Sequence, residues 1–112
     1  MPDQHEQLDL VFKALADPTR RAVVQRLCQG PAPVSELAAP FKMALPSFTQ
    51  HLDVLETCGL VRSRKVGRVR TYRIAPKPLA TAEHWITRQR ALWERRLDQL
   101  DNYLLRLHKE TS

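Results

Sequence analysis

Apolar side chains recur at helical spacing, three or four residues apart, through the first half of the chain. This pattern puts an apolar face on each of four predicted helices, which cover residues 5–16, 18–29, 34–41 and 45–57. Asp17 and Pro18 fit the start of the second helix, because Asp caps a helix N-terminus and Pro is tolerated in a first turn. Gly30 and Gly59 fit the ends of the second and fourth helices.

The pattern changes to strict alternation over residues 61–66 and 69–74, which is the period of a strand. Gly67 and Arg68 lie between the two runs and are typical of a tight turn. These residues therefore predict a β-hairpin, in which we expect Tyr72 to pack rather than to stack on a base.

A long helix is predicted over residues 79–108, after two prolines that end the hairpin. Its apolar residues recur every seven positions, with two further leucines beside them: Ile86, Trp93, Leu100 and Leu107, with Leu97 and Leu104. Pro31 and Pro33, earlier in the chain, predict a stiff connection between the second and third helices.

The predicted element order is α-α-α-α-β-β-α, a mainly α fold with a small β-hairpin. A short helix, a brief turn and a capped helix form a helix-turn-helix, and a hairpin directly after it corresponds to the wing of a winged helix. The length of 112 residues suits one domain, so we expect residues 1–112 to form a single winged helix-turn-helix domain with dimerisation helices at both ends.

Positive charge is concentrated on the predicted hairpin. The whole chain has a formal net charge of +6, and residues 61–75 alone contain six basic side chains and no acidic one. Residues 1–60 contain five basic and seven acidic side chains. This distribution favours a polyanionic partner, and the fold indicates double-stranded DNA.

The predicted DNA contacts come from the fourth helix and the hairpin. In the helix, the polar residues outside the apolar face are expected to meet base edges or phosphate: Ser47, Thr49, Gln50 and His51. In the wing, four cations flank or occupy the turn: Arg64, Lys65, Arg68 and Arg70.

Several neighbouring residues have competing interpretations. His51 fits two interpretations equally well, a packed histidine and a DNA contact. At the base of the hairpin, Arg62 and Arg73 are as easily structural or solvated. We expect Arg20 and Arg21, at the start of the second helix, to be exposed rather than bound to phosphate.

Four segments together resemble the ArsR family of bacterial transcriptional repressors: FKALADPTRRAVVQRL, VSELAAPF, LPSFTQHLDVLETCGLV and RSRKVGRVRTYRI. The stretch WITRQRALWERRLDQLDNYLLRL resembles the Trp-rich last helix of one ArsR subgroup. The resemblance implies a homodimeric repressor that binds a pseudo-palindromic operator. Repression of its own gene is an open alternative for such a repressor. The resemblance also implies an interface made by the first and last helices.

The last helix supports a homodimer independently, because it carries more apolar surface than one small winged helix can cover. The residues expected at the dimer interface are Leu8, Phe12, Trp85, Trp93, Leu97, Leu100 and Leu104.

We expect no metal, no cofactor and no catalysis. The cysteine pair and the Asp-x-His pattern that ArsR metal sensors use are missing from VSELAAPF and from the last helix, and no nucleophile or phosphate-loop motif is present. Two cysteines suit a reducing cytoplasm, and we expect Cys28 and Cys58 to be small buried hydrophobes. No apolar run is long enough to span a bilayer, so no membrane partner is expected.

The leading hypothesis is therefore a sequence-specific DNA-binding transcriptional repressor. One alternative is a winged helix used as a protein-interaction module, and another is a metal- or redox-responsive sensor repressor. The basic hairpin favours DNA over a protein partner, because a protein-binding wing has no need of six cations without an acid.

Overall fold

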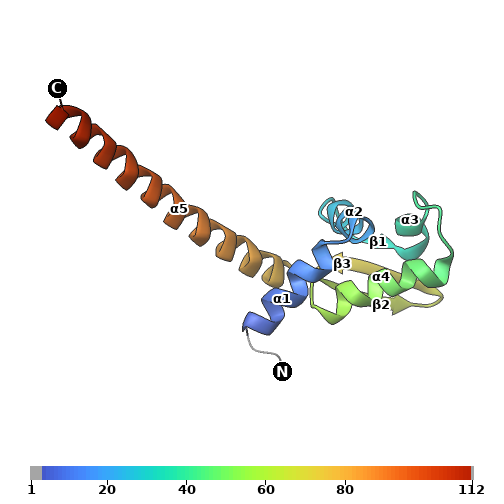
Figure 1. Ribbon diagram of the computed structural model, residues 1–112. Helices are drawn as coiled ribbons and strands as arrows, with labels where there is room; N and C mark the ends of the chain where they lie inside the picture. Colours follow the sequence, from blue (N-terminus) through green and yellow to red (C-terminus); the bar gives the residue numbers. More distant parts are fainter. Residues whose placement is uncertain (1–3, 112) are drawn as a thin grey trace. The chain divides into compact units, whose positions relative to one another are not determined.

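The computed structural model describes residues 4–111, which form two compact units that divide after Ala82. The first unit holds two helices, a short strand, a helix-turn-helix and a hairpin, as Figure 1 shows. The second unit is the greater part of one long helix. The single domain expected over residues 1–112 stays a prediction.

Helices α1 (Gln4–Leu15) and α2 (Pro18–Leu27) form as the apolar spacing predicts. Asp17 is the N-cap of α2, and its Oδ2 accepts a hydrogen bond from the backbone N–H of Arg20 at 3.0 Å. Pro18 begins the helix, where its missing N–H leaves no hydrogen bond unmade.

Helices α3 (Val34–Ala38) and α4 (Leu45–Thr57) form the helix-turn-helix. The α3 helix is shorter than the expected 34–41. Ala39 still has helical angles and its N–H donates to the Ser35 carbonyl, but Pro40 has no N–H to continue the helix.

The end of α4 is set by Gly59, whose φ of +83° is the left-handed conformation that glycine adopts without strain. The Gly59 N–H donates to the Glu56 carbonyl, and the Leu60 N–H donates to the Leu55 carbonyl, both at 3.0 Å. This pair of bonds is a Schellman motif, and it turns the chain so that the fully buried Leu60 leads into the sheet.

The sheet has three antiparallel strands in the order β1-β3-β2. Strands β2 (Val61–Val66) and β3 (Val69–Ile74) form the predicted hairpin, with Ser63 opposite Tyr72. Strand β1 (Ala32–Pro33) lies within the segment expected to be only a stiff connection, so the expected order lacked one strand. Two residues are too few to show a period of two, and Pro33 is tolerated because β1 is an edge strand.

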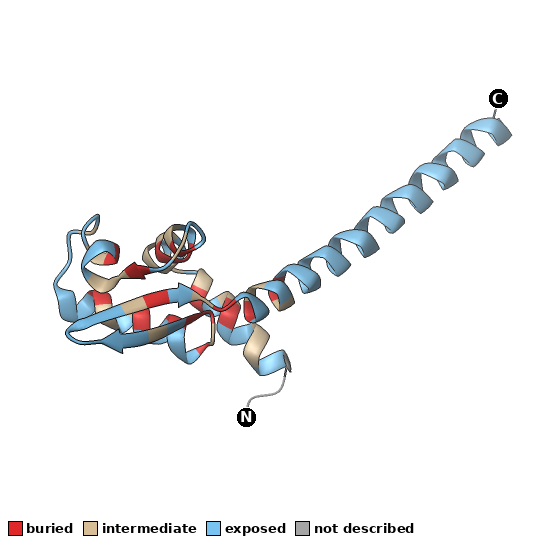
Figure 2. Cartoon of the chain, turned by 180° about the vertical axis from the view of Figure 1, so that it is seen from behind, coloured by how far each residue is buried: buried red, intermediate tan, exposed pale blue. Residues whose placement is uncertain are grey.

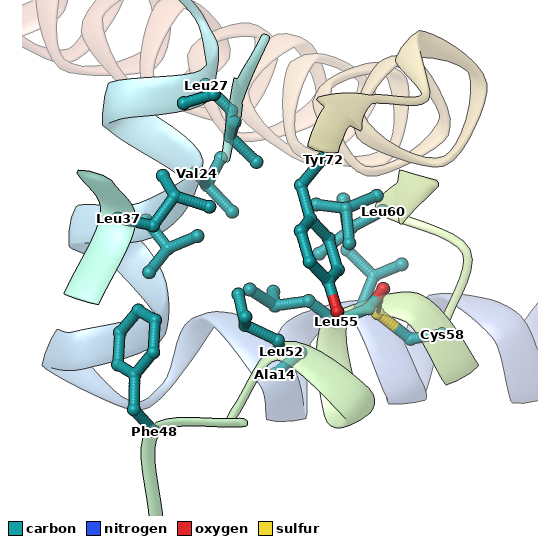
Figure 3. Packing of buried hydrophobic residues seen from close by; sticks show 14 of the residues in the cluster. Ala14, Val24, Leu27, Leu37, Phe48, Leu52, Leu55, Cys58, Leu60 and Tyr72 are labelled. Atoms are coloured by element: carbon teal, nitrogen blue, oxygen red, sulfur yellow. Dashed lines mark hydrogen bonds between the residues drawn. The ribbon is translucent and has the colours of Figure 1, made fainter. Parts of the chain in front are cut away.

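The core of the first unit lies between the helices and the sheet. Phe48, Leu52 and Leu55, on one face of α4, are fully buried. Figure 3 shows the Tyr72 ring extending from β3 into this cluster, and its burial confirms the expected packing role. Because the inner face of α4 is anchored in this way, its opposite face is directed to solvent.

Helix α5 runs from Pro76 to Thr111, three residues earlier than the expected start at 79. Pro76 and Pro78 both fall in its first turn, where N–H groups have no helical partner, so they begin the helix rather than precede it. From Glu83 onward every described residue is exposed, as the pale blue of Figure 2 shows. None of the described helices combines the length and the apolar character needed to cross a membrane.

Candidate nucleic-acid interface

The outer face of α4 presents Ser47 and Gln50 to solvent, one helical turn apart. Both residues lie in the first two turns of the helix, and the buried Phe48 faces the other way. An exposed Gln amide carries both a donor and an acceptor, which is the pattern that pairs with the N6 and N7 atoms of adenine. This face of α4 can therefore meet base edges.

Thr49 is half-buried beside that face, and its hydroxyl is already engaged within the helix. The Thr49 Oγ1 donates to the Pro46 carbonyl at 3.0 Å. The hydroxyl oxygen keeps its capacity to accept a hydrogen bond, but its proton is directed to the backbone.

His51 is half-buried and belongs to a polar cluster that sequence reasoning missed. Its Nδ1 lies 3.1 Å from Nη1 of Arg20 and 3.7 Å from Oδ2 of Asp17. The cluster contacts only the Nδ1 atom of the ring. A packed His51 and a DNA-facing His51 are therefore compatible, because Nε2 is left for a second contact.

The expected exposure of Arg20 is wrong, because its side chain is half-buried and all three guanidinium nitrogens make hydrogen bonds. Its Nε donates to the Ala14 carbonyl at 2.8 Å, and its Nη2 donates to the Lys13 carbonyl at 3.3 Å. These carbonyls belong to the last turn of α1, where a helix leaves acceptors without i+4 partners, although the Lys13 carbonyl also accepts from the Ala16 N–H at 3.3 Å. The open acceptors draw the guanidinium inward. Arg21 is exposed as expected, and its Nη1 donates to the Leu15 carbonyl.

The pKa of the Asp17 carboxyl is lowered from its ordinary value, chiefly by the hydrogen bond from the Arg20 backbone N–H. Desolvation opposes this shift, while the charge of Arg20 adds to it. Asp17 therefore stays ionised at neutral pH and holds a negative charge next to the start of α2, where the helix dipole favours it.

The wing residues Arg64, Lys65, Arg68 and Arg70 are all exposed, but they occupy different parts of the hairpin. Lys65 and Arg70 are opposite each other on the strand face shared with Tyr72. Arg64 points to the other face, and Arg68 lies in the turn. The wing therefore presents cations on both faces and at its tip.

A chain of hydrogen bonds joins the wing to α4. Arg70 Nη1 donates to Ser63 Oγ at 2.8 Å, and Ser63 Oγ donates to Glu56 Oε1 at 2.8 Å. Neither Ser63 nor Glu56 is predicted from the sequence as a site residue. The only signal for this contact in the sequence is the inward position of Ser63 in the alternation of the strand. This chain holds the hairpin in a set orientation to the recognition helix.

The outward face of the wing is strongly basic. Arg62 and Arg73 are direct cross-strand neighbours, and Arg64 lies on the same face. All three are exposed, and together with Pro31, Val66 and Thr71 they line a shallow groove of about 210 Å³. Like charges opposite each other destabilise a sheet, and a bound anion such as a phosphate would offset that repulsion.

The residues expected at the dimer interface fall into two groups. Leu8 and Phe12 of α1 are half-buried against the core of the first unit. The others, in the second unit, are exposed by 39–60%: Trp85, Trp93, Leu97, Leu100 and Leu104.

Neither cysteine lies in a cluster of potential metal ligands, and residues 4–111 contain no group of three His, Cys, Asp or Glu side chains placed to hold a metal ion. The expected burial of Cys28 is wrong, because it caps the C-terminal end of α2 beyond the buried face of that helix. Cys58 is buried, and its Sγ donates to the Leu55 carbonyl at 3.3 Å. Burial raises the pKa of the Cys58 thiol, which keeps it protonated and unreactive.

Comparison with known proteins finds sequence relatives over the helix-turn-helix region. A family profile described as "Helix-turn-helix domain" matches residues 15–64. The HTH-type transcriptional regulator Rv2034 of Mycobacterium tuberculosis is 47% identical over 72 residues, which cover 64% of this chain and 67% of that protein.

Two solved structures extend the likeness to most of the chain. The ArsR family transcriptional regulator RHA00566 is 55% identical with a TM-score of 0.77, over 84% of this chain and 97% of that one. The homodimeric winged helix-turn-helix domain Mb0332 of Mycobacterium bovis is 28% identical with a TM-score of 0.62, over 82% of this chain and 91% of that one. This chain therefore belongs to the ArsR family of winged helix-turn-helix proteins, which are DNA-binding transcriptional regulators and not enzymes.

Proposed function

We propose that this chain represses transcription as a homodimer that binds a pseudo-palindromic operator, with α4 in the major groove and the wing on phosphate or the minor groove. The observation that carries this proposal is the exposed polar face of α4 beside a hairpin rich in cations. Base edges in the major groove distinguish all four base pairs, whereas phosphate contacts set register and affinity.

Within α4, Gln50 and Ser47 are the proposed base contacts, because both are exposed and neither is engaged in a hydrogen bond to another described residue. Thr49 is a proposed phosphate contact through its hydroxyl oxygen. We assign Arg64, Lys65 and Arg68 to phosphate or minor-groove contact, and Arg70 both to that role and to the link with Ser63.

The proposed dimer rests on the apolar face of the second unit. Leu100 and Leu104 are 52% exposed and Trp93 is 60% exposed, and further large apolar side chains of the same helix are exposed as well. A stripe of this size requires a covering surface, and a second copy of the same face provides one of matching chemistry. The homodimeric state of the related domain from Mycobacterium bovis supports this assignment.

Selection of genomic DNA fragments with the purified full chain tests this function. We expect enriched fragments to share an inverted repeat whose half-sites are about 10–10.5 base pairs apart, centre to centre, or a multiple of that spacing. A fragment from the promoter of the chain's own gene among them would support autoregulation. An enriched motif without two-fold symmetry would contradict the dimer, and no enrichment at low salt would favour the protein-interaction module.

A further inference from the structure

The Arg20 guanidinium connects three elements at one side of the recognition helix. Arg20 itself belongs to α2. Its Nε and Nη2 donate to two carbonyls in the last turn of α1, and its Nη1 contacts the ring of His51 in α4. Because α1 fixes two of its nitrogens, the third is held in place against His51 and is not free to move away.

The contact with His51 constrains the proton on the imidazole ring. A guanidinium can only donate hydrogen bonds, so Nδ1 of His51, at 3.1 Å from Nη1, has to accept. A neutral ring that accepts at Nδ1 carries its hydrogen on Nε2. The other group near Nδ1, the Asp17 carboxylate, lies at 3.7 Å and favours the opposite tautomer, in which Nδ1 carries the hydrogen.

The second ring nitrogen of His51 remains available. Every buried side-chain nitrogen and oxygen of the described residues has a hydrogen-bond partner. Nε2 of His51 makes no hydrogen bond to another described residue, so this atom reaches solvent. His51 is one residue beyond Gln50 and one turn beyond Ser47, so Nε2 belongs to the same end of α4 as the proposed base contacts.

We propose that Arg20 is a positioning residue that sets the Nε2–H tautomer of His51, so that the recognition helix offers a hydrogen-bond donor to a purine N7 in the major groove. This inference rests on the proposed function. N7 is the acceptor that guanine and adenine share in that groove, and a lone N–H donor has no use for the amino group of adenine or cytosine. Guanine O6 and thymine O4 also accept hydrogen bonds in that groove, and the proposal commits to N7, so a purine is expected at one position of each half-site.

The tautomer is measured first, on the free full-length protein, from the nitrogen chemical shifts of the His51 ring at neutral pH. Wild type is expected to carry the hydrogen on Nε2. In Arg20→Met, where the Asp17 carboxylate is left as the group nearest to Nδ1, the population with the hydrogen on Nδ1 should rise. Arg21→Met is the matched control, because Arg21 also bonds to an α1 carbonyl but does not contact His51, and it should leave the tautomer unchanged.

The readout on DNA uses an operator in which each purine is replaced in turn by its 7-deaza analogue, which lacks only N7. For wild type, one such replacement per half-site should weaken binding by roughly 2- to 12-fold, the range of one hydrogen bond. Arg20→Met should lose this sensitivity at that position, and Arg21→Met should keep it.

Two results would overturn the inference. One is a wild-type His51 that carries its hydrogen on Nδ1. This measurement uses wild type alone, so it decides the question even if Arg20→Met fails to fold. The other is an operator that binds normally but tolerates 7-deaza replacement of every purine. A wild-type chain that binds no duplex at all would instead overturn the proposed function and its N7 contact, while the tautomer measurement would still decide the role of Arg20.

Discussion

At the scale of single residues, local spacing predicted exposure well where one helix decides it. Ser47 and Gln50 follow from the helical period, since the buried Phe48 and Leu52 fix the opposite face. Arg20 could not be predicted in the same way, because its contact with His51 joins residues 31 positions apart in the chain. The exposure of Cys28 was missed because periodicity does not show where an apolar face stops being covered.

Replacing Gln50 with Ala is expected to weaken operator binding by roughly 1–3 kcal/mol, because the amide pairs with a base edge. Binding to random duplex should change little, since phosphate contacts remain. Gln25→Ala, the same change at an exposed position of α2, is the control. Fluorescence anisotropy with both duplexes measures the difference, and equal losses on operator and random DNA would remove Gln50 from the base contacts.

Asp17 should make the stability of the first unit depend on pH. Its pKa is lowered in the folded state from an ordinary value of 3.8, so its stabilising contribution is complete above that pH and is lost as the pH falls toward the folded pKa. Asp17→Asn keeps an N-cap that does not titrate.

Urea unfolding at pH 6 and pH 3 compares the two proteins. Wild type should lose more free energy of unfolding between these pH values than Asp17→Asn does. Asp17→Ala should cost about 0.5–2 kcal/mol at pH 6 through loss of the cap. Identical losses in wild type and Asp17→Asn would show that this carboxylate does not contribute through its charge.

At the scale of elements, the sequence predicted the hairpin limits and α4 closely, because glycine punctuation and alternation agree there. It missed β1, which has only two residues and owes its existence to pairing with β3, a distant segment. The sequence also predicts the start of α5 too late, because Pro76 and Pro78 fit the first turn of the helix rather than the end of the hairpin. Elements that depend on local pattern were predictable, and those that depend on tertiary pairing were not.

The wing tip should contribute to affinity and not to base preference. Arg68→Ala is expected to weaken binding to operator and random duplex alike, and to reduce the magnitude of the salt slope by about 1, the value for one lost phosphate contact. Arg106→Ala, an exposed arginine of α5, removes the same charge outside the wing and should leave the slope unchanged. A loss confined to the operator would instead place Arg68 at a base edge.

At the scale of the whole molecule, the net charge of +6 equals the charge of the six hairpin cations, and the basic and acidic side chains of the remainder balance. The apolar side chains of the second unit form the other large unexplained surface, since they are exposed from Trp85 to Leu107. A regulator that binds a two-fold operator explains both surfaces, one facing DNA and one facing a second copy.

Leu100→Glu should lower the solution mass from that of a dimer to that of one chain, because it places a charge in the apolar stripe. Leu105→Glu is a close control: Leu105 is 61% exposed but stands about 140° around the helix from Leu100. Light scattering at micromolar concentration measures both. A wild-type mass equal to one chain would contradict the proposed dimer, and a dimer retained by Leu100→Glu would move the interface elsewhere.

The central claim, that this chain binds duplex DNA through α4 and a cationic wing, is tested most directly by a salt titration of wild type on its selected operator. The logarithm of affinity should fall linearly with the logarithm of salt, with a slope of about −4 or steeper, since each neutralised phosphate contributes about −0.9. A slope near zero, or no binding to any duplex at low salt, would contradict the account.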